Sequence, residues 1–275
     1  MRERSPTFLD PFTQASLFLN SQSEHERRHM VRACRFELGK VERLGIRERV
    51  VALFREVDEE FARDVAAGIG VSLVGPPRER AAARKPARGK AITASPALSL
   101  ENQPRASIKT RKVALLAAEG VRAAEIDAAR TALHGGGAAV EVISFVLGAL
   151  HSEEGRPVDV DKTFLTASSV LYDAVYVPGG EASVAALLES DDASDFVHEA
   201  YRHAKPVGAS SEGIELLADS GVAEVAEGQA ARGKLVARRG IVASSAGADR
   251  AFTDAFTAAI AAHRHFEREL ETGAI

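Results

Sequence analysis

The residues best suited to chemistry lie in one short stretch, from Val207 to Leu217. Small and apolar residues there lead into Ser211, Glu212 and Gly213, a pattern that predicts a buried strand, a sharp turn and a helix start. We call these three residues the elbow. In several enzyme families such a turn exposes a nucleophile. Here it carries a serine and a glutamate without a cysteine or an adjacent histidine, so we expect a nucleophilic scaffold that lacks a working nucleophile.

The weakness of Ser211 as a nucleophile follows from its chemistry. A thiolate is accessible near neutral pH, whereas a serine hydroxyl requires a base within hydrogen-bonding distance. The carboxylate of Glu212 would add negative charge and disfavour an alkoxide. His198 and His203 fall on the preceding predicted helix, and nothing in their spacing directs them to Ser211. We therefore expect no hydrolase activity, and keep an enzyme that uses Ser211 as the alternative.

A second candidate is the Pro178-Gly179-Gly180 turn, which follows a predicted strand that starts at Asp173. Glycines allow a sharp turn and leave backbone amides able to face an oxyanion. Open α/β sheets bind ligands at the carboxyl ends of their strands. Alone, the turn is as typical of plain structure as of a site, but the elbow after a later strand makes it more specific. A pocket for an anion or nucleotide at Gly179 and Gly180 is a further alternative.

The remaining reactive side chains are weaker candidates. Cys34 lies on the apolar face of a predicted helix and is expected to be a buried, inert thiol. His25 and His29 have the i, i+4 spacing of metal ligands, but no third ligand is evident. His263 and His265 would diverge on a helix. We therefore expect no metal site.

These residues must be positioned by a domain of alternating strands and helices, residues 113–275. The alternation predicts an α/β fold, a doubly wound parallel sheet with helices on both faces. Residues 151–170 are expected to form a hairpin-like excursion, and Asp249 to start a final helix that reaches about Glu271. Strands are predicted at 112–118, 140–145, 173–178, 206–209 and 240–245, and helices at 122–134, 193–204 and 212–219.

Residues 1–74 are predicted to be a small all-α segment. Ser23 and Glu26 have the spacing of a capping box. An apolar stripe on the following helix comprises Met30, Cys34, Leu38 and Val41, and a second helix carries a stripe from Ile46 to Val65. Helices of this size offer each other only a small core. The stripes therefore predict a missing partner surface, supplied by another domain or another subunit.

Residues 75–112 are predicted to be a linker. Ten Lys and Arg residues face two acidic residues there, an excess of eight positive charges. A stretch of this kind cannot bury enough apolar surface to offset its ordering entropy. It is expected to be a solvated tether, with a strap on the acidic surface of its own oligomer as the alternative. Half of the ten prolines fall in this stretch: Pro76, Pro77, Pro86, Pro96 and Pro104.

Composition limits the partners and the compartment. The net charge of −4 and the absence of aromatic residues among the basic ones of the linker argue against nucleic-acid binding. No apolar run approaches the ~18 residues of a membrane span, and the amino-terminal residues lack the apolar core of a signal peptide. One cysteine excludes an internal disulfide and fits a reducing compartment. We expect a soluble, cytoplasmic protein without membrane or nucleic-acid partners.

The turn from Val113 to Gly120, the Gly-Gly turn and the elbow follow one another in an order that resembles the class I glutamine-amidotransferase-like superfamily, in its DJ-1/PfpI branch. The resemblance covers residues 113–275 and implies a flavodoxin-like fold. In active members the elbow reads Cys-x-Gly, often with His after Cys, and a Glu from the first strand's loop supports the thiol. By this resemblance Ser211 replaces the Cys, Glu212 the His, and Glu119 matches the supporting Glu.

The whole chain resembles something more specific, the large-subunit monofunctional haem catalases. Asp10–Phe18, Glu24–Val31 and Val57–Val71 are similar to the helical region that closes these enzymes. A Pro-rich basic linker and a DJ-1/PfpI-like domain follow in that family, and Ala262–Arg268 fits the end of that domain. The resemblance implies a helical segment at 1–74, a linker at 75–112 and a DJ-1/PfpI-like domain at 113–275.

In that family the haem pocket and the Tyr that binds iron lie upstream of these parts. Tyr172, Tyr176 and Tyr201 are the only tyrosines, and none has the family's Arg-x-x-x-Tyr setting. We therefore expect no cofactor in this chain, although the complete family carries haem. The resemblance leaves open an expressed fragment, a split gene product or a truncated paralogue.

The expected role is that of a non-catalytic part of a hydrogen-peroxide-removing catalase, which supports assembly or stability or gives chaperone-like protection. Expected partners are further copies, as a homo-oligomer (dimer or tetramer), and a catalase haem domain. The alternative is a DJ-1/PfpI-type hydrolase or glyoxalase-like enzyme that uses Ser211.

Overall fold

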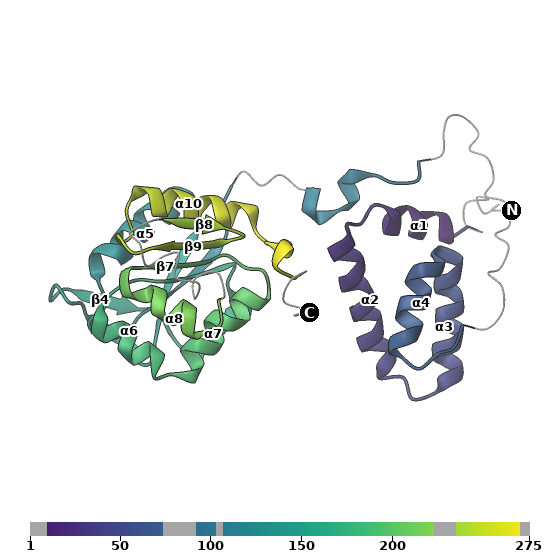
Figure 1. The fold of residues 1–275 in the computed structure, drawn as a ribbon, viewed down its shortest axis with the longest axis horizontal. Helices are drawn as coiled ribbons and strands as arrows, with labels where there is room; N and C mark the ends of the chain where they lie inside the picture. Colours follow the sequence, from purple (N-terminus) through teal and green to yellow (C-terminus); the bar gives the residue numbers. More distant parts are fainter. Residues whose placement is uncertain (1–9, 74–91, 103–106, 223–234, 270–275) are drawn as a thin grey trace, which may run out of the picture. The chain divides into compact units, whose positions relative to one another are not determined.

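The computed structural model describes residues 10–73, 92–102, 107–222 and 235–269. Contacts within the chain divide it into two units, Met1–Pro104 and Arg105–Ile275, coloured from purple to blue and from teal to yellow in Figure 1. The first contains the helices of the amino-terminal region, and the second contains the sheet. No helix among the described residues is long and apolar enough to cross a membrane.

The described residues of the helical unit include four α-helices with a small shared core. The predicted capping box is confirmed, because Ser23 Oγ accepts from the Glu26 amide at 3.3 Å and the Glu26 carboxylate accepts from the Ser23 amide at 2.9 Å. Val51 and Val65 are among the residues at the centre of the core, with Met30, Cys34 and Leu38 partly buried against it. The helices are α1 (Phe12–Asn20), α2 (Glu24–Gly39), α3 (Leu44–Val57) and α4 (Glu59–Gly68).

The prediction of one continuous helix from Ile46 to Val65 is wrong. Asp58 has an extended backbone, with a φ of −160°, and its side chain accepts a hydrogen bond from the Phe61 amide at 2.9 Å. It therefore ends α3 and caps α4. The apolar stripe hid this break because Phe54 and Phe61, on either side of it, still meet edge to face with ring centroids 5.3 Å apart.

Part of the range expected to be a linker packs on the helical unit. The Ser95 amide donates to Ser21 Oγ at 2.8 Å, and the Leu100 amide donates to the Glu26 carboxylate at 2.7 Å. Two short 3-10 helices lie here, η2 (Pro96–Leu98) and η3 (Leu100–Asn102). Residues 107–112 of the expected linker belong to the second unit, whose first strand starts at Lys112. The remaining residues of the expected tether or strap, 75–91 and 103–106, lie outside the described residues.

The second unit is built on a seven-stranded sheet with the order β5-β2-β1-β6-β7-β9-β8. All neighbouring pairs are parallel except β8 and β9, so the predicted parallel α/β sheet is confirmed with one antiparallel edge. β3 and β4 form a separate antiparallel hairpin that begins at Gly148, before the start of the excursion expected at 151–170. The strands are β1 (Lys112–Leu116), β2 (Ala139–Ser144), β3 (Gly148–His151), β4 (Pro157–Val160), β5 (Lys162–Thr163), β6 (Ala174–Val177), β7 (Val207–Ser210), β8 (Val236–Arg238) and β9 (Ile241–Ser244).

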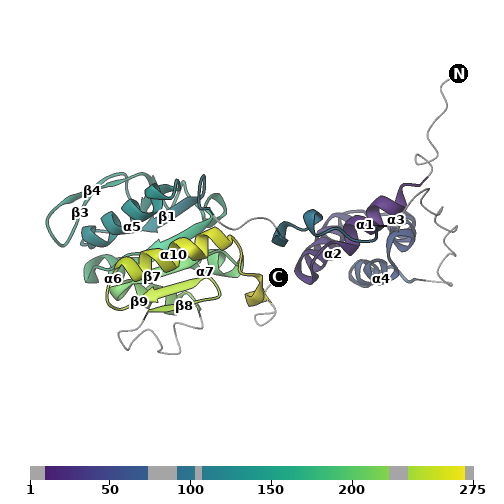
Figure 2. The same cartoon turned by 90° about the horizontal axis from the view of Figure 1, so that it is seen from above.

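Helices cover both faces of this sheet. In Figure 1, α5 and α10 lie on one side and α6, α7 and α8 on the other, over two separate apolar cores. Figure 2 shows α10 lying across β7 and β9, and the hairpin beside α5, to which the Arg156–Asp127 ion pair joins it. The helices are α5 (Ala123–Gly135), α6 (Glu181–Leu188), α7 (Asp191–Arg202), α8 (Ile214–Asp219) and α10 (Arg250–Ala262).

The final helix is shorter than predicted. It ends at Ala262, not near Glu271, because His263 has a φ of +70° that no α-helix contains. The helix α6 has no counterpart in the sequence-based prediction, since its apolar residues continue directly from the Gly-Gly turn. Parallel strands place their carboxyl ends at one edge of a sheet, and this edge brings the turns after β1, β6 and β7 together.

Candidate functional site

The elbow has the predicted strand–turn–helix form. All of β7 is buried, the 3-10 turn η5 (Ser211–Gly213) follows, and α8 begins directly after it. Ser211 has a φ of +51°, a left-handed conformation that costs free energy in a residue other than glycine. Gly213 is required by close packing, because a Cβ there would lie 2.3 Å from the carbonyl oxygen of Val177.

The partner of the elbow is Glu125, in the first turn of α5. Ser211 Oγ donates to its Oε1 at 2.6 Å, and Ser210 Oγ donates to its Oε2 at 2.5 Å. The Gly179 amide also donates to Oε2, at 2.7 Å. The Glu125 side chain is only 6% exposed.

The pairing of Ser211 with Glu119 is therefore wrong. Glu119 Oε2 accepts from the His151 amide at 2.8 Å, and its side chain is 64% exposed. Glu119 lies in the loop that joins β1 to α5, whereas Glu125 lies in the first turn of α5 itself. Both acids follow the first strand within a few residues, and local sequence contains no signal that distinguishes them.

Arg122 is the residue that sequence reasoning missed. Its guanidinium pairs with three carboxylates: Nε with Glu153 at 2.6 Å, and Nη1 with Glu125 and Glu212, both at 3.2 Å. The hydrogen bond with Glu153 raises the pKa of Arg122 above its ordinary value despite partial burial, and Glu212 and Glu125 add to the shift. A permanently charged side chain of the protein itself therefore lies against the elbow.

The amides of the Gly-Gly turn are also occupied. The Gly180 amide donates to Glu212 Oε2 at 3.0 Å, which lowers the pKa of that carboxyl, and Arg122 lowers it further. A Cβ added to Gly179 would lie 2.7 Å from each of Arg122 Nη1, Glu212 Oε2 and Ser211 Cβ. The two amides that could have faced an oxyanion or nucleotide instead bind carboxylates of the chain.

This arrangement gives no support to a hydrolase or glyoxalase-like enzyme that uses Ser211. Among the described residues, the Ser211 hydroxyl contacts a carboxylate and no imidazole. Both oxygens of Glu125 already accept other hydrogen bonds, Oε2 from Ser210 and the Gly179 amide and Oε1 from Arg122. His198 Nδ1 lies 3.1 Å from the Ser220 carbonyl, and His203 pairs with Glu199 at 3.3 Å, so neither serves Ser211.

The tyrosines do not fit the role of a haem-iron ligand. Tyr176 is fully buried with its hydroxyl 2.5 Å from Ser210 Oγ, and burial together with the charge of Glu125 raises its pKa well above the ordinary value. Tyr172 donates to the Glu141 carboxylate at 2.6 Å. The ring of Tyr201 packs under the guanidinium of Arg268, 4.7 Å from its centroid.

The other sequence candidates are dispersed. Cys34 is partly buried on the inner face of α2, where burial raises the pKa of its thiol. His25 Nδ1 lies 2.7 Å from an Arg28 nitrogen, while His263 and His265 pair with different carboxylates. No group of three His, Cys, Asp or Glu side chains in the described ranges could hold a metal ion.

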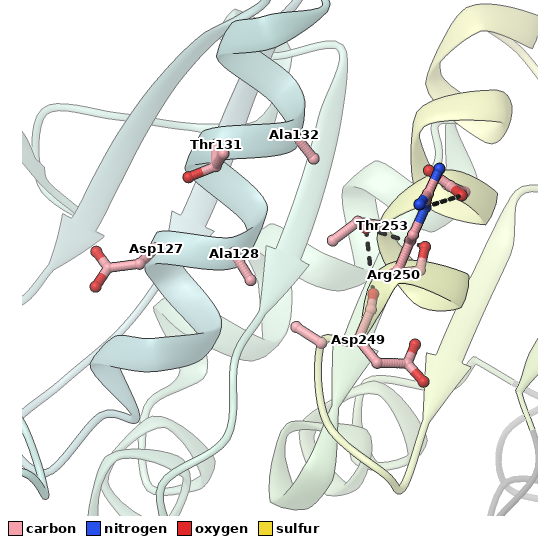
Figure 3. Close-up of a pocket in the computed structure, with 9 residues that line it drawn as sticks. Asp127, Ala128, Thr131, Ala132, Asp249, Arg250 and Thr253 are labelled. Atoms are coloured by element: carbon pink, nitrogen blue, oxygen red, sulfur yellow. Dashed lines mark hydrogen bonds and ion pairs between the residues drawn. The ribbon is translucent and has the colours of Figure 1, made fainter.

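A groove between α5 and α10 encloses about 470 Å³ (Figure 3). Its charged side chains are already engaged: Asp127 with Arg156 at 2.9 Å, Arg250 with Asp254 at 3.5 Å, and Asp249 as the cap of α10. No residue of the elbow lines it. The lining consists of Asp127, Ala128, Thr131, Ala132, Ala248, Asp249, Arg250, Thr253 and Asp254.

Comparison with known proteins identifies the family. Residues 109–269 match the C-terminal domain found in long catalases. The chain belongs to this family. Residues 5–69 match a second family, described as catalase-related immune-responsive. The resemblance to the closing part of a long catalase is thus confirmed, and the two matches fall on the two units of the structure.

Three catalases are similar in sequence to this chain along nearly its entire length. It is 39% identical over 271 residues to Catalase-2 of Bacillus subtilis, covering 98% of this chain and 36% of the relative. The Catalase of Alkalihalophilus pseudofirmus is 37% identical over 273 residues, with 98% and 35% covered. Catalase HPII of Mycobacterium avium is 37% identical over 274 residues, with 98% and 37% covered. The chain thus spans about a third of the length of these relatives.

Proposed function

We propose that this chain is a non-catalytic part of a hydrogen-peroxide-removing catalase and supports the assembly and stability of a homo-oligomer. The observation that carries the proposal is the saturation of the elbow. The Ser211 hydroxyl and the amides of Gly179 and Gly180 all bind Glu125 or Glu212. A substrate would have to displace these charge-assisted hydrogen bonds, each among the stronger ones in proteins, before any donor became available.

Exposed apolar side chains on the helical unit favour a protein partner. Phe36 is 68% exposed and Leu100 79%, and burial of such side chains against a partner would be favourable. We propose further copies of the chain, as a dimer or tetramer, and a catalase haem domain as the partners. The other exposed apolar residues of this unit are Phe18, Leu44, Leu53, Ile92 and Leu98.

Two measurements on the purified chain test this role. Light scattering at micromolar concentration should give a mass well above the 29.2 kDa of one chain, and a monomer would contradict the assembly proposal. Hemin and hydrogen peroxide added together should produce neither a Soret band of bound haem nor oxygen. Oxygen release at a catalase-like rate would refute the non-catalytic role.

Three finer statements accompany this proposal. A flavodoxin-like fold of the class I glutamine-amidotransferase type is supported by the parallel strand order and by the elbow after β7. A cytoplasmic location is supported by the single cysteine. Chaperone-like protection is supported by the exposed apolar residues, and its test is the suppression of thermal aggregation of an unrelated protein, followed by turbidity.

A further inference from the structure

A second group of charged side chains lies at the edge of the sheet opposite to the elbow. Arg111, Asp173 and Lys205 come just before β1, β6 and β7, which are neighbouring parallel strands. α10 starts after the carboxyl end of β9, so its far end returns to the amino edge and brings His263 and Arg264 there. We call these five residues the amino-edge cluster.

Asp173 is the one carboxylate of the cluster. It accepts from Arg111 Nη1 at 3.3 Å and from the Lys112 amide at 2.9 Å, and lies 3.4 Å from His263 Nε2. Burial alone would raise its pKa, but the hydrogen bond of His263 and the Lys112 amide, with the charge of Arg111, lower it to about 2. Asp173 is therefore charged at any ordinary pH, and Arg111 already neutralises it.

Two further cations have no carboxylate partner among the described residues. Lys205 is 5% exposed, and the hydrogen bond of its Nζ goes to the Ser169 carbonyl at 2.5 Å. Arg264 is half-buried, and its Nη1 donates to the His263 carbonyl at 3.0 Å. Cations removed from water without a counter-ion are unfavourable. The five residues therefore hold three positive charges against the one negative charge of Asp173, and Glu199 is a second carboxylate whose charge acts on Lys205.

These cations influence one another. Burial, and then the charge of Arg264, lower the pKa of Lys205 to about 8, although the charges of Asp173 and Glu199 oppose the shift. Burial also lowers the pKa of Arg264, and the charge of Arg111 adds to that shift, although Asp173 opposes it. An anion placed among them would relieve both effects.

The backbone at the end of α10 is strained where it delivers Arg264. His263 has φ +70° and ψ −59°, and the Arg264 amide donates to the Ala262 carbonyl at 2.9 Å, closing a three-residue turn. This turn is rare in proteins because it is strained. The turn ends α10 at Ala262 and leaves Arg264 at the amino edge of the sheet, near enough for the charge of Asp173 to act on it.

We propose that the amino-edge cluster is a binding site for a single oxyanion, a carboxylate, phosphate or sulfate group. Arg264 offers a planar fork of donors that matches such groups, and Lys205 adds a second positive charge. The anion is either a small molecule or an acidic side chain of a second copy of this chain. The small-molecule form does not depend on the proposed assembly role.

Thermal unfolding of the full chain in sodium phosphate or sulfate, with chloride at equal ionic strength as reference, tests the site. Arg264→Gln removes the fork. Arg250→Gln is the matched control, because Arg250 is 93% exposed at the other end of the same helix. Phosphate should raise the Tm of the wild type and of R250Q by about 2–4 °C at concentrations several times the dissociation constant, and R264Q should lose most of this shift.

Light scattering separates the two sources of the anion. If a second copy supplies the anion, phosphate should dissociate the wild-type oligomer. Without phosphate, the mass measured for R264Q should then be lower than the mass measured for R250Q. Arg264→Lys keeps the charge but not the planar fork. This variant should fold like the wild type and bind the anion more weakly, which distinguishes lost binding from lost folding. Equal behaviour of R264Q and R250Q in both assays, or a wild type that responds in neither, would overturn the proposal.

Discussion

Replacement of Glu125 by Gln tests the geometry of the elbow most directly. Glu125→Gln keeps the shape of the side chain but removes its charge and turns one acceptor into a donor. In the place of Oε2 that donor would face the Ser210 hydroxyl and the Gly179 amide, and in the place of Oε1 it would face the Ser211 hydroxyl and Arg122. A hydroxyl can turn to accept, but the Gly179 amide or Arg122 Nη1 is left without its acceptor, and Arg122 loses one of its three carboxylates.

The magnitude follows from these contacts. A hydrogen bond to a charged group contributes about 1.5–3 kcal/mol, and an unsatisfied buried amide costs about 1–3 kcal/mol. Breaking a buried ion pair costs about 3–5 kcal/mol, but Arg122 keeps Glu153 and Glu212, which reduces this loss. We expect a total destabilisation of about 3–5 kcal/mol, equivalent to a fall in Tm of roughly 6–20 °C for a unit of this size.

The matched control is Glu119→Gln, the same chemical change on a side chain that is 64% exposed. It should alter the free energy of unfolding by less than about 0.5 kcal/mol. Urea unfolding followed by circular dichroism suits this chain, which has no Trp. If E119Q lost as much stability as E125Q, or if E125Q were neutral, the assignment of Glu125 as the partner of Ser211 would be refuted.

Three further outcomes are expected. The pKa of Asp173 is about 2 in the folded protein, against an ordinary value of 3.8. Its contribution to the free energy of unfolding is therefore full above pH 4 and is lost as the pH falls through 2. Asp173→Asn should cost about 1–2 kcal/mol at pH 7 and almost nothing at pH 2, as measured by urea unfolding. Gly213→Ala should lower the free energy of unfolding by more than about 3 kcal/mol, because its Cβ would overlap the Val177 carbonyl. A Cβ added at Gly39 has nothing within 4 Å, so Gly39→Ala should leave Tm unchanged or higher. Equal Tm values for the two variants would contradict the packing argument. Ser211→Cys should add no esterase activity over background, since the amides beside it remain occupied, and a thiol-dependent burst of product would show that they open.

The elements that follow from local chemistry could be predicted from the sequence. The capping box of α2 and the strand–turn–helix of the elbow depend on residues close together in the chain, and both are confirmed. The parallel sheet follows from the alternation of strands and helices. The break at Asp58 was missed because the apolar stripe continues across it, although Asp58 before Glu59 and Glu60 is a recognisable helix start.

The features that could not be predicted depend on contacts distant in sequence. Glu119 and Glu125 both follow β1, and the path of this connection in the folded protein decides which of them reaches the elbow. Arg122 becomes central because Glu153, from the hairpin, and Glu212, from the elbow, both pair with it. The end of α10 carries neither Gly nor Pro. Its stop at His263 comes from a strained backbone that residue preferences disfavour.

The carboxylate of Glu26 connects the start of α2 to the segment around Leu100. One oxygen caps α2 through Ser23, and the other accepts the amide of Leu100 from the returning segment. The first unit is therefore complete only when the segment around Leu100 is present, and a protein divided after residue 74 would separate α2 from a backbone that it binds. Anyone who wishes to produce the helices in isolation should place the cut beyond Asn102, where the last of these attachments has been made.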